Sequence, residues 1–183
     1  AFAFGGCQVD TAAWDATTTV LGLTGDDATL AVPLPFTYKH AGVDYTTANV
    51  STNGVLNFLA PDTSYGNTAI PVAAAPNAAI YGFWDDLIVD SMASVRTETL
   101  GTAPNRRFVI EWRNVHFFSD TTRRIDVNVV LHENGQILTQ SRNLADDGRA
   151  SGSYRFPVPE WSDIATLAVR LRGSDRGTGR DSF

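Results

Sequence analysis

Two Asn-Gly dipeptides, each next to short strand-forming runs, constrain this chain most. Asn53-Gly54 separates the run Tyr45–Ser51 from Val55–Leu59, and Asn134-Gly135 precedes the run Ile137–Gln140. Both central residues of a type I′ turn need a positive φ, which Asn and Gly tolerate better than other residues. The sequence therefore predicts two β-hairpins, each closed by a type I′ turn.

Alternation of side chains extends this strand pattern over much of the chain. The runs Arg106–Val115 and Arg124–His132 both place apolar residues at every second position, whereas helical periodicity is almost absent. Turn residues recur roughly every 8–12 positions, a spacing typical of a sandwich or barrel. We predict an all-β fold, an antiparallel β-sandwich of jelly-roll-like type with irregular termini.

Ten strands are expected from these patterns, and the four between residues 93 and 142 are joined by short turns. Those four are predicted to form an antiparallel meander. The predicted strands are Thr17–Leu23, Ala28–Val32, Val43–Ser51, Val55–Leu59, Ala79–Val89, Ala93–Leu100, Arg106–Val115, Arg124–His132, Gln136–Arg142 and Ala165–Arg172.

The length of 183 residues fits one domain, and the 43% apolar and 19% charged content is ordinary for a globular chain. We predict a single sandwich domain over residues 1–172, with an irregular N-terminal segment at 1–16. Ala145–Ser153 is predicted to be a polar loop. Residues 173–183 are predicted to form a flexible or partner-docked tail.

Charge is distributed unevenly along the chain. The formal net charge is −6, made up of −8 over residues 1–95 and +2 over residues 96–183. Nucleic-acid binding depends on basic patches that neutralise phosphates, and this chain offers none in its sequence. Nucleic acid is therefore excluded as an expected partner.

Several features predict an exported protein. The chain starts with AFAFGG, which is typical of what remains after a signal peptide is cleaved, and thirteen arginines against one lysine indicate the codon usage of an actinobacterium. Cys7 is the single cysteine, so it is a buried thiol, a modified residue or a partner in an intermolecular bond. Pro71 and Pro76 break the longest apolar stretch before it reaches the ~20 residues of a membrane helix, so no membrane insertion is expected.

A set of motifs in the first two thirds of the chain resembles a known family. Phe36 enters one strand, Ser51–Gly54 form an S-T-N-G turn, and Trp84–Asp86 end a later strand with W-D-D. Over roughly Leu23–Asn143 the order of these motifs resembles a domain of secreted actinobacterial proteins and, more distantly, the nidogen-type (NIDO) domain of matrix and adhesion proteins. The resemblance implies a secreted β-sandwich that binds or assembles, and it brings no catalytic residues.

Acidic residues gather after the aromatic strand that ends at Trp84. Asp85, Asp86 and Asp90 are the candidate ligands of a calcium ion, which takes six to eight oxygen ligands. The alternative is that these carboxylates are solvated or paired with arginine, because neighbouring strand residues face opposite sides. Asp26-Asp27 and Asp146-Asp147-Gly148 lack the spaced pattern of a calcium loop, and turn-forming roles explain them adequately.

Aromatic and arginine residues supply the candidate binding contacts. Trp84 and Trp112 fall in predicted strands and are expected in the core, whereas Phe118 and Trp161 are expected to be exposed. Arginine pairs flank two neighbouring strands and are expected to pair with acids, either within the domain or in a neighbouring copy. These pairs are Arg106 with Arg107 and Arg123 with Arg124.

A complete catalytic set is not recognisable in the sequence. His40, His116 and His132 lack the spacing of a zinc site, and there is no G-x-S-x-G motif. The leading hypothesis is a secreted, non-catalytic structural or adhesive module. It would act through contacts with an extracellular protein or with further copies of itself, as an oligomer or polymer. Two alternatives stay open: a carbohydrate-binding module with exposed aromatics and a calcium ion, and a hydrolase whose site assembles only in three dimensions.

Overall fold

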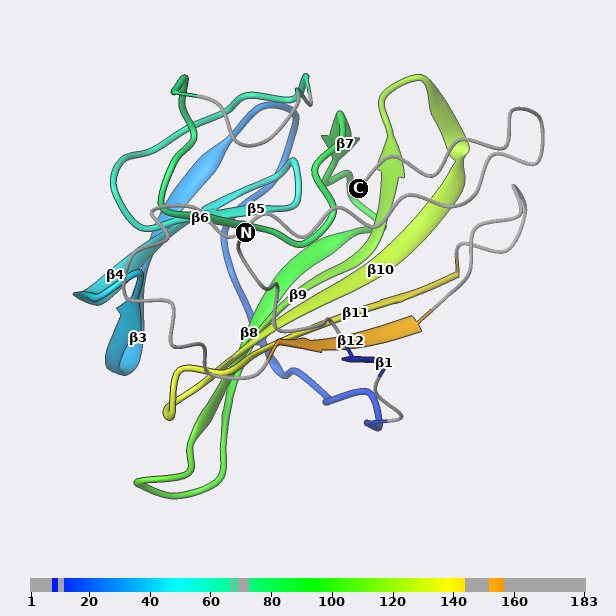
Figure 1. The fold of residues 1–183 in the computed structure, drawn as a ribbon. Helices are drawn as coiled ribbons and strands as arrows, with labels where there is room; N and C mark the ends of the chain where they lie inside the picture. Colours follow the sequence, from blue (N-terminus) through cyan, green and yellow to red (C-terminus); the bar gives the residue numbers. More distant parts are fainter. Residues whose placement is uncertain (1–7, 10–11, 67, 69–72, 144–151, 157–183) are drawn as a thin grey trace.

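The structure, a computed structural model, describes residues 8–9, 12–66, 68, 73–143 and 152–156. Within these residues the chain is all-β, and two antiparallel sheets pack against each other (Figure 1). The predicted antiparallel β-sandwich is confirmed. The described residues contain no helix capable of spanning a membrane.

The two sheets differ in size. The smaller sheet has the order β3-β4-β5-β6, and the larger has the order β1-β12-β11-β10-β9-β8-β2, with β7 paired to β9. The strands are β1 (Gln8–Val9), β2 (Thr19–Val20), β3 (Thr29–His40), β4 (Val43–Ser51), β5 (Val55–Asn57), β6 (Ala79–Tyr81), β7 (Leu87–Ile88), β8 (Ser94–Leu100), β9 (Arg107–Phe117), β10 (Asp120–His132), β11 (Ile137–Arg142) and β12 (Gly152–Phe156).

The predicted meander is confirmed, because β8, β9, β10 and β11 pair with one another in chain order. Their inner face forms the main core with the smaller sheet. Trp112 is fully buried there, and its Nε1 donates a hydrogen bond to the carbonyl oxygen of Ser51 at 2.8 Å. This bond links the centre of the larger sheet to the β4–β5 turn of the smaller one.

Both predicted hairpins exist, but neither is closed by a type I′ turn. Of the two central residues, only the glycine has a positive φ, 73° at Gly54 and 90° at Gly135. At the second hairpin the Gly135 amide donates to the carbonyl of His132, and the His132 amide donates to the carbonyl of Gln136. This pattern fits a three-residue loop in which glycine takes the left-handed position.

The predicted strand Ala79–Val89 is wrong as a single element. The chain forms β6 in the smaller sheet, leaves it after Tyr81, and forms β7 against β9 in the larger sheet. Gly82 makes the crossing possible, because a Cβ at this position would lie 2.6 Å from a methyl carbon of Val129. Side-chain alternation could not reveal this change of sheet.

β3 extends well beyond the predicted strand Ala28–Val32 and contains two prolines. Pro33 and Pro35 lie inside β3, and the pairing with β4 shifts register between Pro33 and Tyr38. β3 is an edge strand, where a residue without an amide donor is tolerated. Prolines on such an edge also hinder pairing with another sheet.

The ends of the described chain are more regular than predicted. β1 lies in the segment expected to be irregular, and β12 begins inside the predicted loop Ala145–Ser153.

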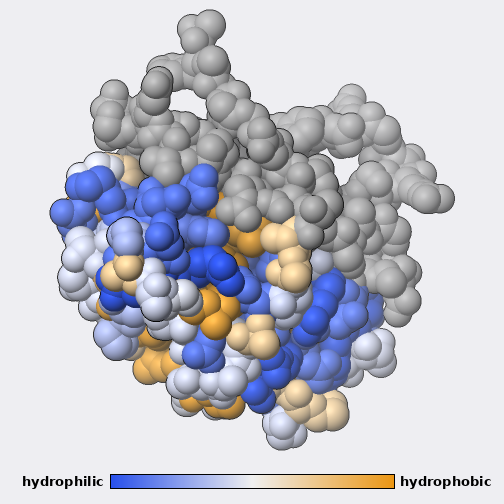
Figure 2. All heavy atoms as spheres, turned by 90° about the horizontal axis from the view of Figure 1, so that it is seen from below, coloured by the Kyte–Doolittle hydropathy of each residue, from blue (hydrophilic) through white to orange (hydrophobic). Residues whose placement is uncertain are grey.

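Side chains on the lower side of the molecule are mostly hydrophilic over its described part, with apolar ones scattered among them (Figure 2). The predicted strand Ala165–Arg172, the tail 173–183, Cys7 and Trp161 lie outside the described residues.

Candidate functional site

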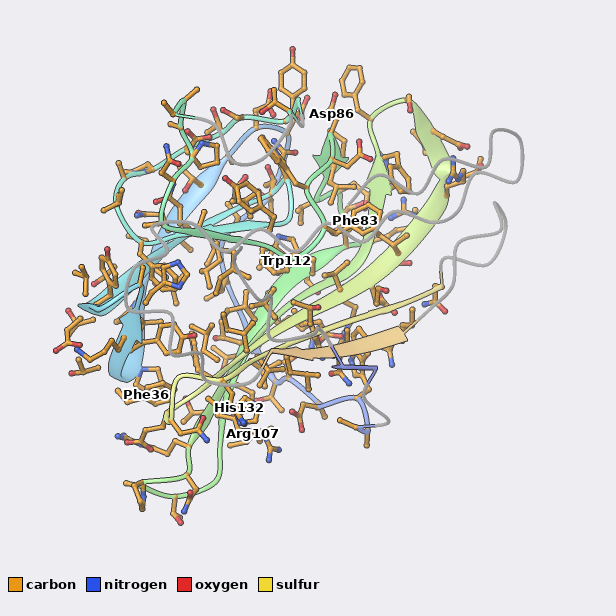
Figure 3. The ribbon with its side chains drawn as sticks, viewed as in Figure 1. Phe36, Phe83, Asp86, Arg107, Trp112 and His132 are labelled. Carbon is orange, nitrogen blue, oxygen red and sulfur yellow. The ribbon has the colours of Figure 1, made fainter. Side chains whose placement is uncertain are left out.

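Loops gather acidic and aromatic residues at one end of the sandwich. Asp86 lies at this end, whereas Phe36, Arg107 and His132 lie at the opposite one (Figure 3). The amide of Phe118, in the β9–β10 turn, donates to the carbonyl of Asp86 at 2.9 Å. We call this region, residues 26–27, 62–65, 84–92 and 117–124, the loop end.

Three carboxylates meet at the loop end. Asp26 and Asp27 come from the turn before β3, and Asp86 comes from the connection between β6 and β7. One oxygen from each lies within 4.8 Å of the others, and Asp26 and Asp27 are exposed. We call these three residues the acidic cluster; among the described residues they are the group that could hold a divalent cation such as calcium.

Asn53 holds the acidic cluster to the core. Its side chain is fully buried, and Nδ2 donates to Asp27 Oδ1 at 2.7 Å and to the carbonyl of Thr63 at 3.2 Å. Its Oδ1 accepts the amide of Leu87 at 3.0 Å. One asparagine therefore joins the turn before β3, the loop after β5 and the start of β7.

The electrostatics of Asp86 reflect this crowding. Partial burial raises the pKa of its carboxyl above the ordinary value, and the neighbouring charges of Asp26, Asp27 and Asp85 raise the pKa further. Like charges held close together disfavour ionisation of each. A cation bound among them would relieve this repulsion.

The three predicted calcium ligands do not come together. Asp86 joins the acidic cluster, while Asp85 Oδ1 accepts the backbone amide of Asp86 at 2.8 Å. Asp90 forms an ion pair with Arg124 at 2.5 Å, and this hydrogen bond lowers the pKa of Asp90. The alternative of arginine pairing therefore describes Asp90, and calcium binding stays a prediction for a different set of carboxylates.

The loop end also carries exposed apolar side chains. Phe118 is 59% exposed, Tyr65 is 53% exposed and Met92 is 65% exposed. Trp84 Nε1 donates a hydrogen bond at 2.8 Å to the carbonyl oxygen of Ser64, the residue before Tyr65. Phe118 is exposed as predicted, and Trp112 lies in the core as predicted, whereas Trp84 is only partly buried and lies at the loop end.

The four predicted arginines make contacts within the domain, at least three of them with acids. Arg106 binds Glu133 at 2.6 Å and Arg107 binds Asp15 at 2.9 Å. The guanidinium of Arg123 lies 4.9 Å from the centre of the Phe117 ring, and Arg124 pairs with Asp90. Of the two pairs, Arg123 and Arg124 belong to the loop end.

Sequence reasoning missed the central residues of this region. The Asn-Gly pattern predicts only a turn role for Asn53. The unspaced pair Asp26-Asp27 likewise indicates a turn and does not indicate metal ligands. The signal that could have found Asn53 is the S-T-N-G motif, whose four residues are all buried although the motif forms a turn. A turn whose polar side chains are buried must satisfy their hydrogen bonds inside the protein, so such a turn can join separate segments.

Comparison with known proteins adds one finding to this geometry. The model of a protein family described as NIDO related matches residues 6–155. No curated protein and no solved structure matches this chain.

Proposed function

This chain belongs to the NIDO-related family, and from that membership we propose that it is a secreted, non-catalytic adhesive module that contacts other proteins through its loop end. Phe118 carries the proposal: this phenylalanine is 59% exposed, and its backbone amide is bonded to the carbonyl of Asp86, one of the three clustered carboxylates. Exposed aromatic residues are enriched among the anchors of protein interfaces. Among the described residues, three of the six exposed large hydrophobic side chains belong to the loop end, which favours a contact role there: Tyr65, Met92 and Phe118.

The negative charge of the loop end indicates which kind of partner surface it would bind. The acidic cluster and Asp85 give the loop end a negative potential, which attracts a basic surface and repels an acidic one. The apolar side chains would then supply affinity that salt does not screen. A protein surface that combines basic and apolar side chains fits both properties, and a further copy of this chain is one candidate.

Bead adhesion tests this proposal. Beads coated with the intact chain should cluster with one another or bind beads coated with a basic protein, and Phe118→Ser should reduce this adhesion at least several-fold. Val43→Ser is the matched control, because Val43 is 53% exposed on β4, outside the loop end. Equal loss of adhesion in both variants, or no adhesion to any protein-coated bead, would contradict the proposal.

A carbohydrate-binding module is the second candidate function. Exposed aromatic rings stack on sugar rings, and Tyr65 and Phe118 lie in loops next to a group of carboxylates that could hold calcium. Affinity electrophoresis through neutral and acidic polysaccharides distinguishes the two candidates. Retention that disappears with chelator and in Phe118→Ser favours the carbohydrate function, whereas unretarded migration in every polysaccharide favours protein contacts.

A further inference from the structure

The N-terminal part of the described chain forms both edges of the larger sheet. β1 pairs with β12 at one edge, and β2 pairs with β8 at the other. The sheet order places six strand spacings of about 4.8 Å between them, or roughly 29 Å. The residues from Val9 to Thr19 can span about 33–36 Å when extended. The segment between the two edge strands is therefore just long enough to reach across the sheet.

Its contacts trace that crossing over the face turned away from the smaller sheet. Gln140 on β11 donates to the carbonyls of Ala12 and Ala13 at 3.1 and 3.3 Å. Trp14 Nε1 then donates to Glu111 on β9 at 3.2 Å, and Thr18 Oγ1 donates to Glu98 on β8 at 2.5 Å. We call residues 8–9 and 12–21 the strap.

The strap covers a face that is unsuited to water. Val109, Val130 and Leu138 form an apolar cluster there, with Ala12 of the strap packed against it. The carboxylate of Glu111 is fully buried beside them and accepts hydrogen bonds from Trp14, Thr17 and Arg113. Removing the strap would open both edges of the sheet, expose the apolar cluster and take two donors from Glu111.

A short hinge connects the strap to the rest of the sandwich. The amide of Leu21 bonds to the carbonyl of Val95 on β8, and Leu23 is buried in the main core. Gly22 lies between them, exposed, with no atom within 4 Å of the place where a Cβ would be. Glycine adopts more backbone conformations than other residues, and this one has open space around it, so Gly22 is suited to act as a hinge.

We infer that the strap is exchangeable between copies of this chain: the strap of one copy binds across the larger sheet of another, and the two copies are joined through their Gly22 hinges. The contacts described above join the strap to strands β8 to β12 of the larger sheet, so an exchanged strap makes the same contacts on another copy. Exchange of an identical element is a low-cost route to association. The inference is independent of the function proposed for the loop end, which lies elsewhere on the molecule.

Disulfide trapping of full-length chains tests the exchange. Thr18 and Glu98 face each other across β2 and β8, where opposite Cβ atoms are about 4.5–5.5 Å apart, close enough to bridge after small adjustment. In a Cys7→Ser background, Thr18→Cys is introduced into one chain and Glu98→Cys into another. The two chains are refolded together at high concentration and then oxidised.

We expect a disulfide-linked pair of the two different chains at a yield at least ten-fold above that of a control mixture. The control combines Thr18→Cys with Lys39→Cys, because Lys39 is exposed on the smaller sheet, away from β2. A single chain that carries both Thr18→Cys and Glu98→Cys, oxidised while dilute, locks its own strap. Light scattering should then find monomers only, whereas the unlocked chain should form dimers or larger assemblies. Mixed pairs at the control level, together with a strictly monomeric unlocked chain, would overturn the inference.

Discussion

Acidic residues meet aromatic ones in two regions of this molecule, beneath the strap and at the loop end, with opposite consequences. Beneath the strap, the buried carboxylate of Glu111 is neutralised by Arg113 and accepts a hydrogen bond from Trp14. At the loop end, the acidic cluster brings three carboxylates together, and partial burial together with their repulsion raises the pKa of Asp86. The first arrangement stabilises the fold, whereas the second costs stability. Groups that cost stability are expected where a protein binds something else.

The largest loss of stability at the loop end is expected from displacing the β4–β5 turn, which contains Asn53 and Gly54. In Gly54→Ala, the new Cβ would clash with the carbonyl oxygen of Phe83, and φ at this position is 73°. We expect the free energy of unfolding to fall by about 4 kcal/mol, measured by urea denaturation. Gly25→Ala is the control, since its φ is 94° but nothing lies near the new Cβ. The control should lose only about 1–2 kcal/mol, and an equal loss in both variants would contradict the close-approach argument.

Glu111→Ala tests the stabilising region. Removing one partner of a buried, hydrogen-bonded pair leaves Arg113 and the strap donors without their acceptor, so the free energy of unfolding should fall by about 3 kcal/mol. Amide exchange should also accelerate in the strap before it accelerates in the smaller sheet. Glu98→Ala is a useful comparison, because its partner Thr18 is exposed and the loss should be small. A stability unchanged by Glu111→Ala would show that the strap does not depend on this carboxylate.

Calcium bound by the acidic cluster should raise the stability of the protein through the loop end. If the acidic cluster binds calcium, a concentration roughly ten times the dissociation constant should raise the free energy of unfolding by about 1.4 kcal/mol. Differential scanning calorimetry in calcium and in chelator measures this shift. Asp27→Asn should abolish it, whereas Asp44→Asn, which is exposed on β4, should retain it. Identical melting curves in calcium and chelator would leave the cluster without a cation.

The smallest expected effect concerns Asp86 itself. Its carboxyl has a raised pKa in the folded state, so ionisation above the ordinary pKa favours the unfolded state. In chelator at pH 7, Asp86→Asn should therefore stabilise the protein, by less than about 1 kcal/mol because the site is partly solvated. At pH 3, below the ordinary value, the aspartate is protonated and the difference should vanish. A destabilised variant at pH 7 would mean that hydrogen bonding outweighs the repulsion.

How far the sequence predicts this molecule depends on the range of the interactions involved. Alternation and turn residues are local, so the β8–β11 meander and both hairpins followed from them. The crossing at Gly82 and the path of the strap depend on contacts between residues far apart in the chain, such as Thr17 with Glu111. For the same reason Asp86 could be predicted as a candidate calcium ligand from its local acidic run. Its proximity to Asp26 and Asp27 could not be predicted, because these residues are far from it in the chain.

Radical footprinting of the bound chain tests most directly whether the loop end makes the external contacts. The intact chain is oxidised by hydroxyl radicals free in solution and while it holds protein-coated beads together, and each side chain is quantified by mass spectrometry. Phe118 and Tyr65 should become several-fold less reactive on binding, whereas Val43, which is as exposed as Tyr65, should stay unchanged. Protection of Val43 with undiminished oxidation of Phe118 and Tyr65 would contradict the account.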